Sequence, residues 1–274
     1  MNVTENKDKT SRLLSAIKNG DIDRAEKLIK KGADVNAKDE FGRTALMYAG
    51  EHGYTDVAKL LIEKGADVNA KDNDVRPVLM CAAAYGHTEF TKMLIEKGAD
   101  VNAKSKLGWT ALMYAEMYGY TELAKLLIEK GADVNAKDKF GRTALMYAGE
   151  HRYTDVARLL IEKGADVNAK DNDGRTALMY TGEHWYTELA TLLIENGADV
   201  NAKDEFGRTA LMYAVMNGYA NVARLLIKNG ADVNAKDGLR RTALMYAKEY
   251  WYTEFARLLG DSQTTNLLRP DKHK

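Results

Sequence analysis

The tetrapeptide Gly-Ala-Asp-Val recurs along the chain without a break in its spacing. Its copies, which mark repeats one to seven, begin at Gly32, Gly65, Gly98, Gly131, Gly164, Gly197 and Gly230, each 33 residues after the last. Self-similarity at a fixed period of this length predicts a solenoid, in which each repeat buries its apolar face against its neighbours. It replaces the arrangement of one large or two ordinary domains that a length of 274 residues alone would favour.

The first part of each repeat has the pattern of a short helix. In repeat one, Leu46 and Ala49 stand three positions apart and therefore fall on one helical face. Thr44 is expected to cap this helix, because a threonine hydroxyl can accept a hydrogen bond from one of the first free amides. Gly53 then ends the segment.

A second helix is expected from about residue 55 to residue 64, where Val57, Leu60 and Leu61 form a broader apolar face. Gly65 follows at the place where a helix commonly ends in a left-handed residue. The stretch after it contains aspartate and asparagine, which favour tight turns and local hydrogen bonds. Each repeat is therefore expected to consist of helix, glycine, helix, glycine and a protruding turn.

This order of elements, repeated every 33 residues, closely resembles the ankyrin repeat. The resemblance covers the seven full repeats and a leading half-repeat from about Thr10 to Lys31. The usual family signature TPLHxA is here TALMYA, a form that resembles microbial ankyrin proteins. The resemblance implies an all-α solenoid of stacked helix-turn-helix units with protruding β-turn or hairpin-like loops. It also implies a concave surface, formed by turn tips and first helices, that binds other proteins.

The signature histidine of the family is replaced by methionine in every repeat. Methionine cannot make the polar contacts of a histidine, so we expect this layer to depend on apolar packing. The residues concerned are Met47, Met80, Met113, Met146, Met179, Met212 and Met245.

Some repeats lack a glycine that the pattern requires. Repeat two has Val75 at the turn glycine and Pro77 after Arg76, so a local distortion is expected there, because glycine reaches φ > 0 without steric cost. Arg152, Trp185 and Trp251 replace the glycine between the two helices, where a side chain would strain the turn. The two tryptophans could instead cover the convex side or an edge of the stack.

The repeat pattern sets the expected domain boundaries. Residues 1–9 are expected to be a flexible N-terminus, and residues 10–31 an N-terminal capping half-repeat. Residues 32–260 would form a single ankyrin repeat domain whose last repeat is the C-terminal cap. Residues 261–274 carry no repeat and are expected to be disordered.

The composition argues against several classes of protein. Forty Lys and Arg residues balance forty Asp and Glu residues, which is unlike a dedicated nucleic-acid or acidic-membrane binder. No run approaches the length of a membrane-spanning helix, and the N-terminus lacks the apolar region of a signal peptide. The single cysteine, Cys81, excludes an intramolecular disulfide. We expect a cytoplasmic monomer, with secretion into a host cell as the open alternative.

Three glutamate-histidine pairs end first helices, at His52, His151 and His184. They could form acid/base pairs, or a metal site shared by His151 and His184, since packed helices lie about 8–10 Å apart. The pair in repeat one has no histidine at the equivalent place of the neighbouring repeat, where Ala84 and Tyr85 stand, so we interpret all three as duplicated, exposed framework. Cys81 is interpreted as a buried structural thiol. We expect no catalytic residue, no metal and no cofactor.

A lysine also recurs at each turn and could track the phosphates of a nucleic acid. An aspartate follows each of these lysines except Lys104, so we interpret the row as a locally neutralised, solvated edge, with nucleic-acid binding as a minor alternative. The row is Lys38, Lys71, Lys104, Lys137, Lys170, Lys203 and Lys236.

The candidate binding site lies where the repeats differ. Turn arginine and helix glutamate recur together in repeats one, four and five, and are expected to form ion pairs worth roughly 0–1 kcal/mol each. Repeats two to four interrupt this pattern with the aromatic and methionine residues that are typical of an interface core, and with arginines at the rim. The predicted binding residues are Tyr85, Leu107, Trp109, Met117, Tyr118 and Phe140, with Arg76 and Arg142 as rim.

Trp109 and Tyr118 are the centre of this prediction, because Leu107 and Phe140 could instead brace neighbouring turn tips. The sequence thus favours a non-catalytic scaffold that binds a partner protein, without nucleic acid, membrane or cofactor. Two alternatives stay open: a structural or engineered consensus-like array without a dedicated ligand, and a microbial effector directed at a host.

Overall fold

The structure, a computed structural model, describes residues 3–151, 153–184, 186–250 and 252–260. The expectations for Arg152, Trp185, Trp251 and residues 261–274 lie outside these residues. The chain divides into two compact units, Met1–Lys139 and Phe140–Lys274, where the sequence predicts one domain over residues 32–260. Such a division is physically natural, because each repeat of a solenoid contacts only its neighbours and no core is shared by all of them.

The first compact unit contains the leading half-repeat and repeats one to three. Its helices are α1 (Val3–Lys18), α2 (Ile22–Lys30), α3 (Ala45–His52), α4 (Thr55–Glu63), α5 (Val78–Ala83), α6 (Thr88–Glu96), α7 (Ala111–Tyr118) and α8 (Thr121–Glu129). Because α1 begins at Val3, residues 3–9 are helical rather than flexible as expected. They contain no glycine or proline and continue the helix that buries Leu13 and Ile17.

The second compact unit contains repeats four to seven. Its helices are α9 (Ala144–His151), α10 (Thr154–Glu162), α11 (Ala177–Glu183), α12 (Thr187–Glu195), α13 (Ala210–Met216), α14 (Ala220–Lys228), α15 (Ala243–Glu249) and α16 (Thr253–Leu258). Across the residues that the structure describes, the only β-type pairing is an isolated bridge between Lys71 and Pro77. The predicted all-α solenoid is confirmed.

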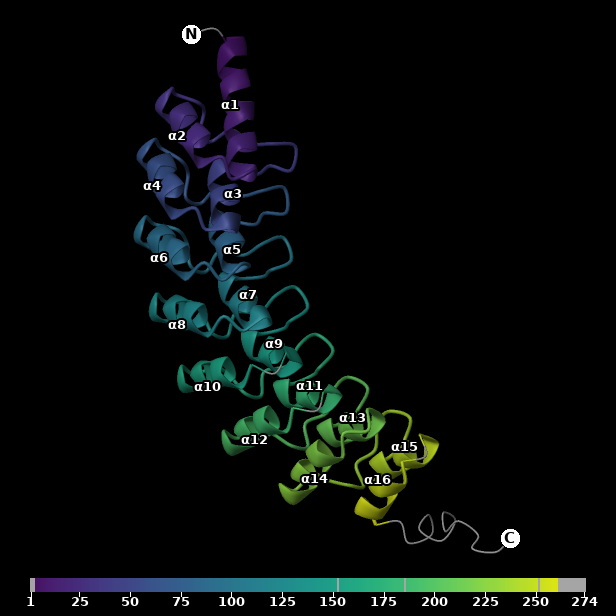
Figure 1. The fold of residues 1–274 in the computed structure, drawn as a ribbon. Helices are drawn as coiled ribbons and strands as arrows, with labels where there is room; N and C mark the ends of the chain where they lie inside the picture. Colours follow the sequence, from purple (N-terminus) through teal and green to yellow (C-terminus); the bar gives the residue numbers. More distant parts are fainter. Residues whose placement is uncertain (1–2, 152, 185, 251, 261–274) are drawn as a thin grey trace, which may run out of the picture. The chain divides into compact units, whose positions relative to one another are not determined.

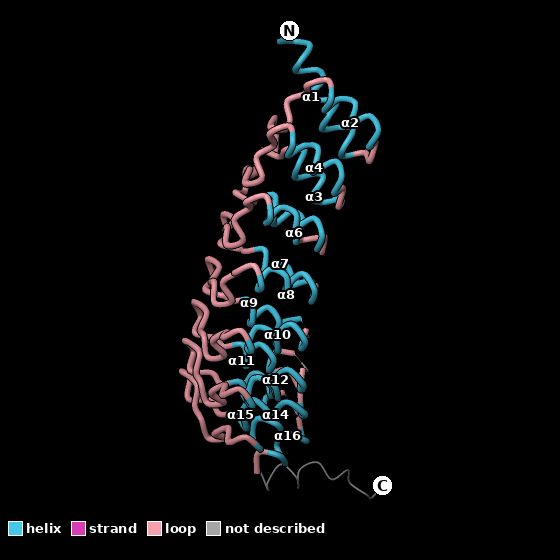
Figure 2. The backbone as a smooth tube through the Cα atoms, turned by 90° about the vertical axis from the view of Figure 1, so that its left-hand side faces the viewer, coloured by secondary structure: helices cyan, strands magenta, loops and turns pink. Residues whose placement is uncertain are grey.

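Within each unit the helices form two layers (Figure 1). Odd-numbered helices contact the next odd-numbered helix, and most even-numbered helices contact the next even-numbered one. The long turns project from the layer of odd-numbered helices, as the pink segments of Figure 2 show for each unit. The turn tips and the ends of the first helices are therefore the places where a repeat can present variable side chains.

Threonine and glycine mark the ends of the first helix of repeat one, as predicted. The Thr44 hydroxyl accepts a hydrogen bond from the amide of Met47 at 3.4 Å and so caps α3. Gly53 ends α3 in the left-handed region, with φ of 72°. The helix is closed at both ends by the residue types that best satisfy its free backbone groups.

The local distortion expected in repeat two is present in part: α5 has 6 residues where α3 has 8, and Lys71 and Pro77 form an isolated bridge, but the turn itself keeps its φ. Val75 has φ of 61°, close to the 74° of Gly42 at the equivalent place in repeat one. A β-branched residue in this region is strained, so the fold imposes the turn on a residue that does not favour it. Pro77 stands at the N-cap of α5 without a side-chain capping bond.

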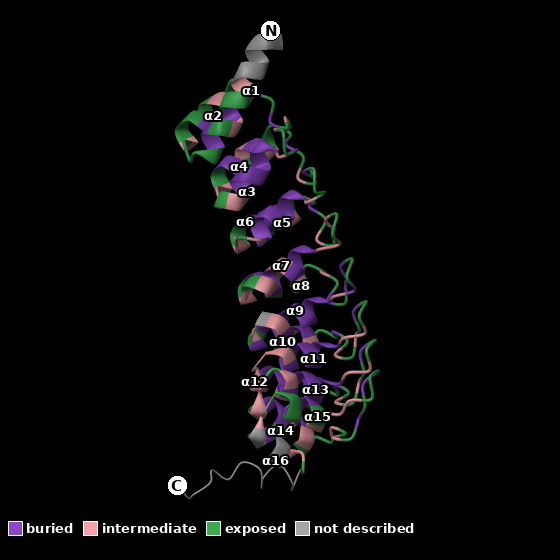
Figure 3. Ribbon diagram, turned by 90° about the vertical axis from the view of Figure 1, so that its right-hand side faces the viewer, coloured by how far each residue is buried: buried purple, intermediate pink, exposed green. Residues whose placement is uncertain are grey.

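The core lies in the layer of first helices, which the other helices and the neighbouring repeats enclose (Figure 3). In α3, six consecutive residues from Ala45 to Gly50 are buried. The signature methionines are buried in repeats one to six, which confirms the expected apolar packing there, whereas Met245 of repeat seven is 52% exposed. A first helix with a neighbouring first helix on each side has most of its surface covered, so even short helices are held firmly.

Asparagine side chains join one repeat to the next. The amide of Asn36 donates to the Gly65 carbonyl at 2.8 Å, and its oxygen accepts from the Asp67 amide at 2.8 Å. Asn69, Asn102, Asn168 and Asn201 make the same two bonds one repeat further on. Sequence analysis explained this asparagine by local turn bonding, but its side chain reaches across 29 and 31 residues.

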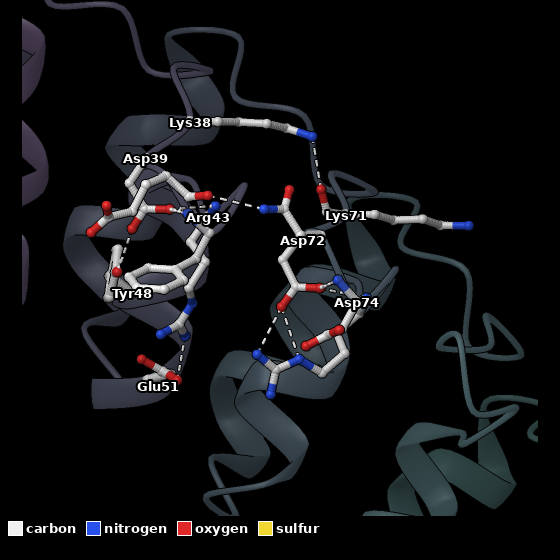
Figure 4. Close-up of polar contacts among 12 residues, drawn as sticks. Lys38, Asp39, Arg43, Tyr48, Glu51, Lys71, Asp72 and Asp74 are labelled. Carbon is white, nitrogen blue, oxygen red and sulfur yellow. Dashed lines mark hydrogen bonds and ion pairs between the residues drawn. The ribbon is translucent and has the colours of Figure 1, made fainter.

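The lysine row also has a structural role. Lys38 Nζ donates to the carbonyl of Lys71 at 2.7 Å (Figure 4), and Lys104, Lys170 and Lys203 bond to the following repeat in the same way. Asp39, which was expected to neutralise Lys38, instead accepts bonds from its own turn. These four lysines therefore link adjacent repeats.

Candidate protein-binding surface

A polar cluster fixes the turn to the first helix in repeat one (Figure 4). Asp39 Oδ1 accepts from the amides of Phe41 and Arg43 at 3.0 and 2.8 Å, and Oδ2 accepts from the Tyr48 hydroxyl at 2.6 Å. The Arg43 guanidinium lies over the Tyr48 ring, 4.4 Å from its centroid, and forms an ion pair with Glu51. We refer to this arrangement as the turn cluster.

The electrostatics of the turn cluster favour structure over catalysis. Burial acts to raise the pKa of Asp39, but hydrogen bonds from Tyr48 and the turn amides lower it overall. Burial, together with donation to Asp39, raises the pKa of Tyr48 to about 12. Neither group titrates near neutral pH, which a general acid or base must do.

The second compact unit repeats the turn cluster. Tyr180, Tyr213 and Tyr246 donate to Asp171, Asp204 and Asp237 at 2.6–2.7 Å. The predicted ion pairs of repeats one, four and five are confirmed, and repeat seven adds one more. The pairs are Arg43–Glu51, Arg142–Glu150 at 3.3 Å, Arg175–Glu183 at 2.9 Å and Arg241–Glu249 at 3.7 Å.

Repeat two lacks two members of the turn cluster. Cys81 stands at the place of the tyrosine and Ala84 at the place of the glutamate. Arg76 turns to Asp72 instead, with its Nε and Nη2 both 2.8 Å from Asp72 Oδ2. Burial raises the pKa of the Cys81 thiol to about 11, so it is protonated and unreactive at neutral pH, which agrees with the interpretation as a buried structural thiol.

Repeat three lacks three members. Ser105 replaces the aspartate, Trp109 the arginine and Met117 the glutamate. Ser105 Oγ still accepts from the Trp109 amide at 3.2 Å, so the turn keeps its shape. The Trp109 ring lies against Tyr114, with the ring centroids 5.1 Å apart. Repeat two has thus lost one ionic side chain of the turn cluster, and repeat three all three, with Trp109 and Met117 in two of the places.

Two cavities open where the turn cluster is incomplete. One has a volume of about 490 Å³, and its lining includes Arg76, Cys81, Ala84, Tyr85, Tyr114 and Tyr118. The other has a volume of about 520 Å³, and its lining includes Arg76, Leu107, Trp109, Tyr114, Met117 and Tyr118. Because Arg76, Tyr114 and Tyr118 line both cavities, we treat the two as one surface, called the aromatic surface below.

The aromatic surface contains six of the eight predicted binding residues. Arg76, Leu107, Trp109, Met117 and Tyr118 share the second cavity, and Tyr85 lines the first. Tyr85, Leu107 and Tyr118 are 55%, 42% and 47% exposed, so they are open to a partner. Phe140 and Arg142 belong to the second compact unit, and Arg142 pairs with Glu150 as part of a turn cluster.

Sequence analysis missed Tyr114 and Glu116. Tyr114 stands at the position of Tyr48, where most repeats have a tyrosine, so it does not stand out in the pattern. The signal that could have identified it is Ser105, which replaces the aspartate that accepts a hydrogen bond from this tyrosine in repeat one. Glu116 is wholly buried, and both of its carboxylate oxygens lack a hydrogen-bond partner. Burial raises the pKa of Glu116 well above its ordinary value of 4.5. It occupies the position of Gly50 in repeat one.

The histidines have structural neighbours rather than an acidic site around them. His52 stacks on Tyr54 and His184 on Tyr186, with centroids 5.2 and 5.4 Å apart, and the side chain of His151 is not described. Within the described ranges, His, Cys, Asp and Glu side chains nowhere form a group of three or more that could hold a metal ion.

Repeat six keeps the turn arginine, Arg208, but has Met216 in place of the glutamate. Burial acts to lower the pKa of Arg208, but hydrogen bonding to the Tyr213 hydroxyl and the nearby charges, including that of Asp204, together raise it. The guanidinium also lies 5.2 Å from the centroid of Phe206. Repeats six and two thus share one feature: each keeps the turn arginine but has no glutamate at the end of its first helix.

The stacked helix pairs, the projecting turns and the bonds between repeats define a helical solenoid of the interaction-module type. The family model for ankyrin repeats (3 copies) matches residues 1–72, 71–138, 135–204, 168–237 and 186–268, so the chain belongs to the ankyrin repeat family. Ankyrin repeats are in general protein–protein interaction modules and typically lack enzymatic activity. A comparison with curated proteins gave no match. In the described part of the chain, no helix combines the length and apolar character needed to cross a membrane.

Proposed function

We propose that the chain is a non-catalytic scaffold that binds a partner protein through the aromatic surface of its first compact unit. The observation that supports this is the local replacement of the turn cluster. Repeats two and three are the ones in which two or more members of the turn cluster are replaced, and there the two cavities form. Aromatic, methionine and arginine side chains around a hollow are typical of the centre of a protein interface.

The substitutions of repeats two and three also free surface that the framework otherwise uses. Elsewhere the arginine and the glutamate satisfy each other, which leaves little for a partner to gain. Here Tyr85 and Tyr118 are exposed. In repeat one a glutamate, Glu51, directly precedes the equivalent His52, whereas Ala84 precedes Tyr85 and Met117 precedes Tyr118. Each presents a large ring with a polar hydroxyl, and such side chains give both contact area and hydrogen bonds at interfaces.

The double variant Trp109→Ala, Tyr118→Ala tests the proposal. Pull-down from the cytosol of the source cell is expected to lose the partner, because removal of two central aromatic residues typically costs more than about 2 kcal/mol, or roughly thirtyfold in affinity. The circular dichroism spectrum should stay that of the wild type. Capture at the wild-type level would contradict the proposal and favour an array without a dedicated ligand.

Tyr250 supplies the matched control. It occupies in repeat seven the position that Tyr118 occupies in repeat three, and it is 44% exposed. Its ring centroid lies 6.0 Å from that of Tyr252, much as the centroids of Tyr118 and Tyr120 are 5.9 Å apart. The single variant Tyr250→Ala therefore removes an equivalent exposed ring outside the aromatic surface, and is expected to capture the partner normally.

A further inference from the structure

Within the part of the chain that the structure describes, five of the six turn arginines form an ion pair with a carboxylate and Arg208 does not. Four of them pair with a glutamate eight residues later, and Arg76 pairs with Asp72 instead. For Arg208, none of the described residues places a carboxylate within ion-pair distance of the guanidinium. Asp204 lies close enough to raise the pKa of Arg208, but repeat six lacks the second carboxylate that pairs with the arginine in repeats one, four, five and seven.

The nearby carboxylates are already engaged. Asp204 accepts from the Tyr213 hydroxyl at 2.6 Å and from the amides of Arg208 and Phe206 at 2.7 and 2.9 Å. In the flanking repeats, Glu183 and Glu249 are held by their own arginines. Repeats five and seven thus place an aspartate and a glutamate beside each turn arginine, whereas repeat six places the aspartate alone, Asp204, beside Arg208.

The surroundings of Arg208 leave its guanidinium able to bind an anion. The Phe206 ring lies beside the guanidinium, and Phe206 is itself 54% exposed. The guanidinium carries five N–H donors, of which the one on Nε is buried and the other four are on the two terminal nitrogens. The remaining donors can bind a carboxylate through two parallel hydrogen bonds, the geometry that guanidinium groups favour.

We propose that Arg208 binds an acidic side chain of a partner protein, whose carboxylate takes the place that glutamate occupies in repeats one, four, five and seven. Met216 and Phe206 would contact the apolar stem of that side chain and its neighbours. The partner is thus an acidic peptide segment with an apolar residue beside the acid. This site lies in the second compact unit and does not depend on the aromatic surface.

The chain offers a sharp test, because Met216→Glu supplies the missing carboxylate from within. A display library of random heptapeptides is selected on the wild-type protein and, in parallel, on the Met216→Glu variant. Peptides that bind the wild type and not the variant are expected to be enriched in Asp or Glu next to an apolar residue. Absence of such peptides, or discriminating peptides without an acid, would overturn the proposal.

Selected peptides are then synthesised with Glu or Gln at the acidic position, and their affinities are measured by fluorescence anisotropy. Replacement of Glu by Gln, Met216→Glu and Arg208→Gln are each expected to weaken binding at least tenfold. Met216→Gln is the matched control: it has the shape of the glutamate variant without its charge, and should bind within about twofold of wild type. Equal losses in the Gln and Glu variants would contradict a carboxylate site.

Two further measurements separate this proposal from others. Thermal unfolding of Met216→Glu should match or exceed that of wild type, since four other repeats carry the same ion pair, so its loss of binding would not reflect unfolding. The Trp109→Ala, Tyr118→Ala variant should bind the acidic peptides normally. If it did not, the peptides would be ligands of the aromatic surface and the Arg208 site would be refuted.

Discussion

Asp72 and Arg76 form a pair that no neighbouring repeat has: both Nε and Nη2 of the arginine lie 2.8 Å from one carboxylate oxygen. In repeat one the equivalent oxygen accepts from Tyr48, and the arginine pairs with Glu51. The pair in repeat two is a rearrangement that follows from two small side chains, Cys81 and Ala84. It leaves space where a tyrosine ring and a glutamate would stand, and that space is the first cavity.

Restoring the tyrosine should therefore close the cavity. In Cys81→Tyr, the new hydroxyl is expected to reach Asp72 as Tyr48 reaches Asp39, and the ring to occupy part of the 490 Å³ volume. The variant should stay folded, because other repeats accommodate this residue, and should lose partner capture like Trp109→Ala, Tyr118→Ala. A pull-down that recovers as much partner as wild type would show that the first cavity takes no part in binding.

The Cys81 thiol is expected to be protected in the folded protein. With its pKa raised to about 11 by burial, only about one thiol in a thousand is ionised at pH 8, and burial blocks access as well. Reaction with a thiol-specific disulfide reagent at pH 8 should be at least about a hundredfold slower in buffer than in denaturant. Similar rates in the two conditions would mean that the thiol is exposed.

Glu116 predicts how stability depends on pH. Its pKa in the folded protein is raised above 4.5, so the folded state binds a proton that the unfolded state releases. This contribution to stability is complete below about pH 4.5 and is lost as pH rises toward the folded-state pKa, with a slope of up to about 1.4 kcal/mol per pH unit. Glu116→Gln removes a titrating group, and urea unfolding between pH 4.5 and 8 should show a smaller decline than in wild type. Parallel curves for the two proteins would contradict a buried, protonated carboxyl.

Val75→Gly should stabilise the protein by about 1 kcal/mol, because glycine adopts a φ of 61° without the strain of a β-branched residue. Chemical unfolding of the two proteins measures the difference. The reverse change is expected at Gly42, where an added Cβ would lie 2.3 Å from Asn73 Oδ1, so Gly42→Ala should destabilise. A loss of stability in Val75→Gly would mean that contacts of the valine outweigh its strain.

Removal of one of the asparagine side chains that bond to the next repeat, called asparagine rungs below, should weaken the coupling of adjacent repeats. Asn69→Ala deletes the bonds to the Gly98 carbonyl at 3.0 Å and from the Asp100 amide at 2.9 Å, with an expected loss of about 1–2 kcal/mol. Faster amide exchange should be confined to the turn of residues 98–103. Asn221→Ala is the control, since that exposed side chain accepts only from Arg224, within its own helix. An equal effect of both variants would indicate that the rung contributes nothing specific.

Sequence periodicity was sufficient for the fold, because each repeat carries its own signals: threonine starts a helix, glycine ends it, and the apolar faces follow. It was also sufficient for most of the aromatic surface, since Trp109 and Met117 are visible departures from a repeated pattern. The burial of Glu116 could not be predicted from the periodicity. In TALMYAEMY the glutamate stands one residue earlier than in TALMYAGEH, and one residue turns a side chain about 100° around a helix, here from the solvent-facing side to the core. The cavities depend on how side chains fill space between repeats, which no linear pattern specifies.

The asparagine rungs make the array tolerant of a change in length. Each rung joins a residue to positions 29 and 31 further along, so it depends only on the next repeat having the common framework. If residues 174–206 were excised, Asn168 would meet Gly230 and Asp232, the groups that Asn201 binds now. Whole repeats can thus be lost or copied with every backbone group still satisfied, while the side chains that select a partner are reshuffled.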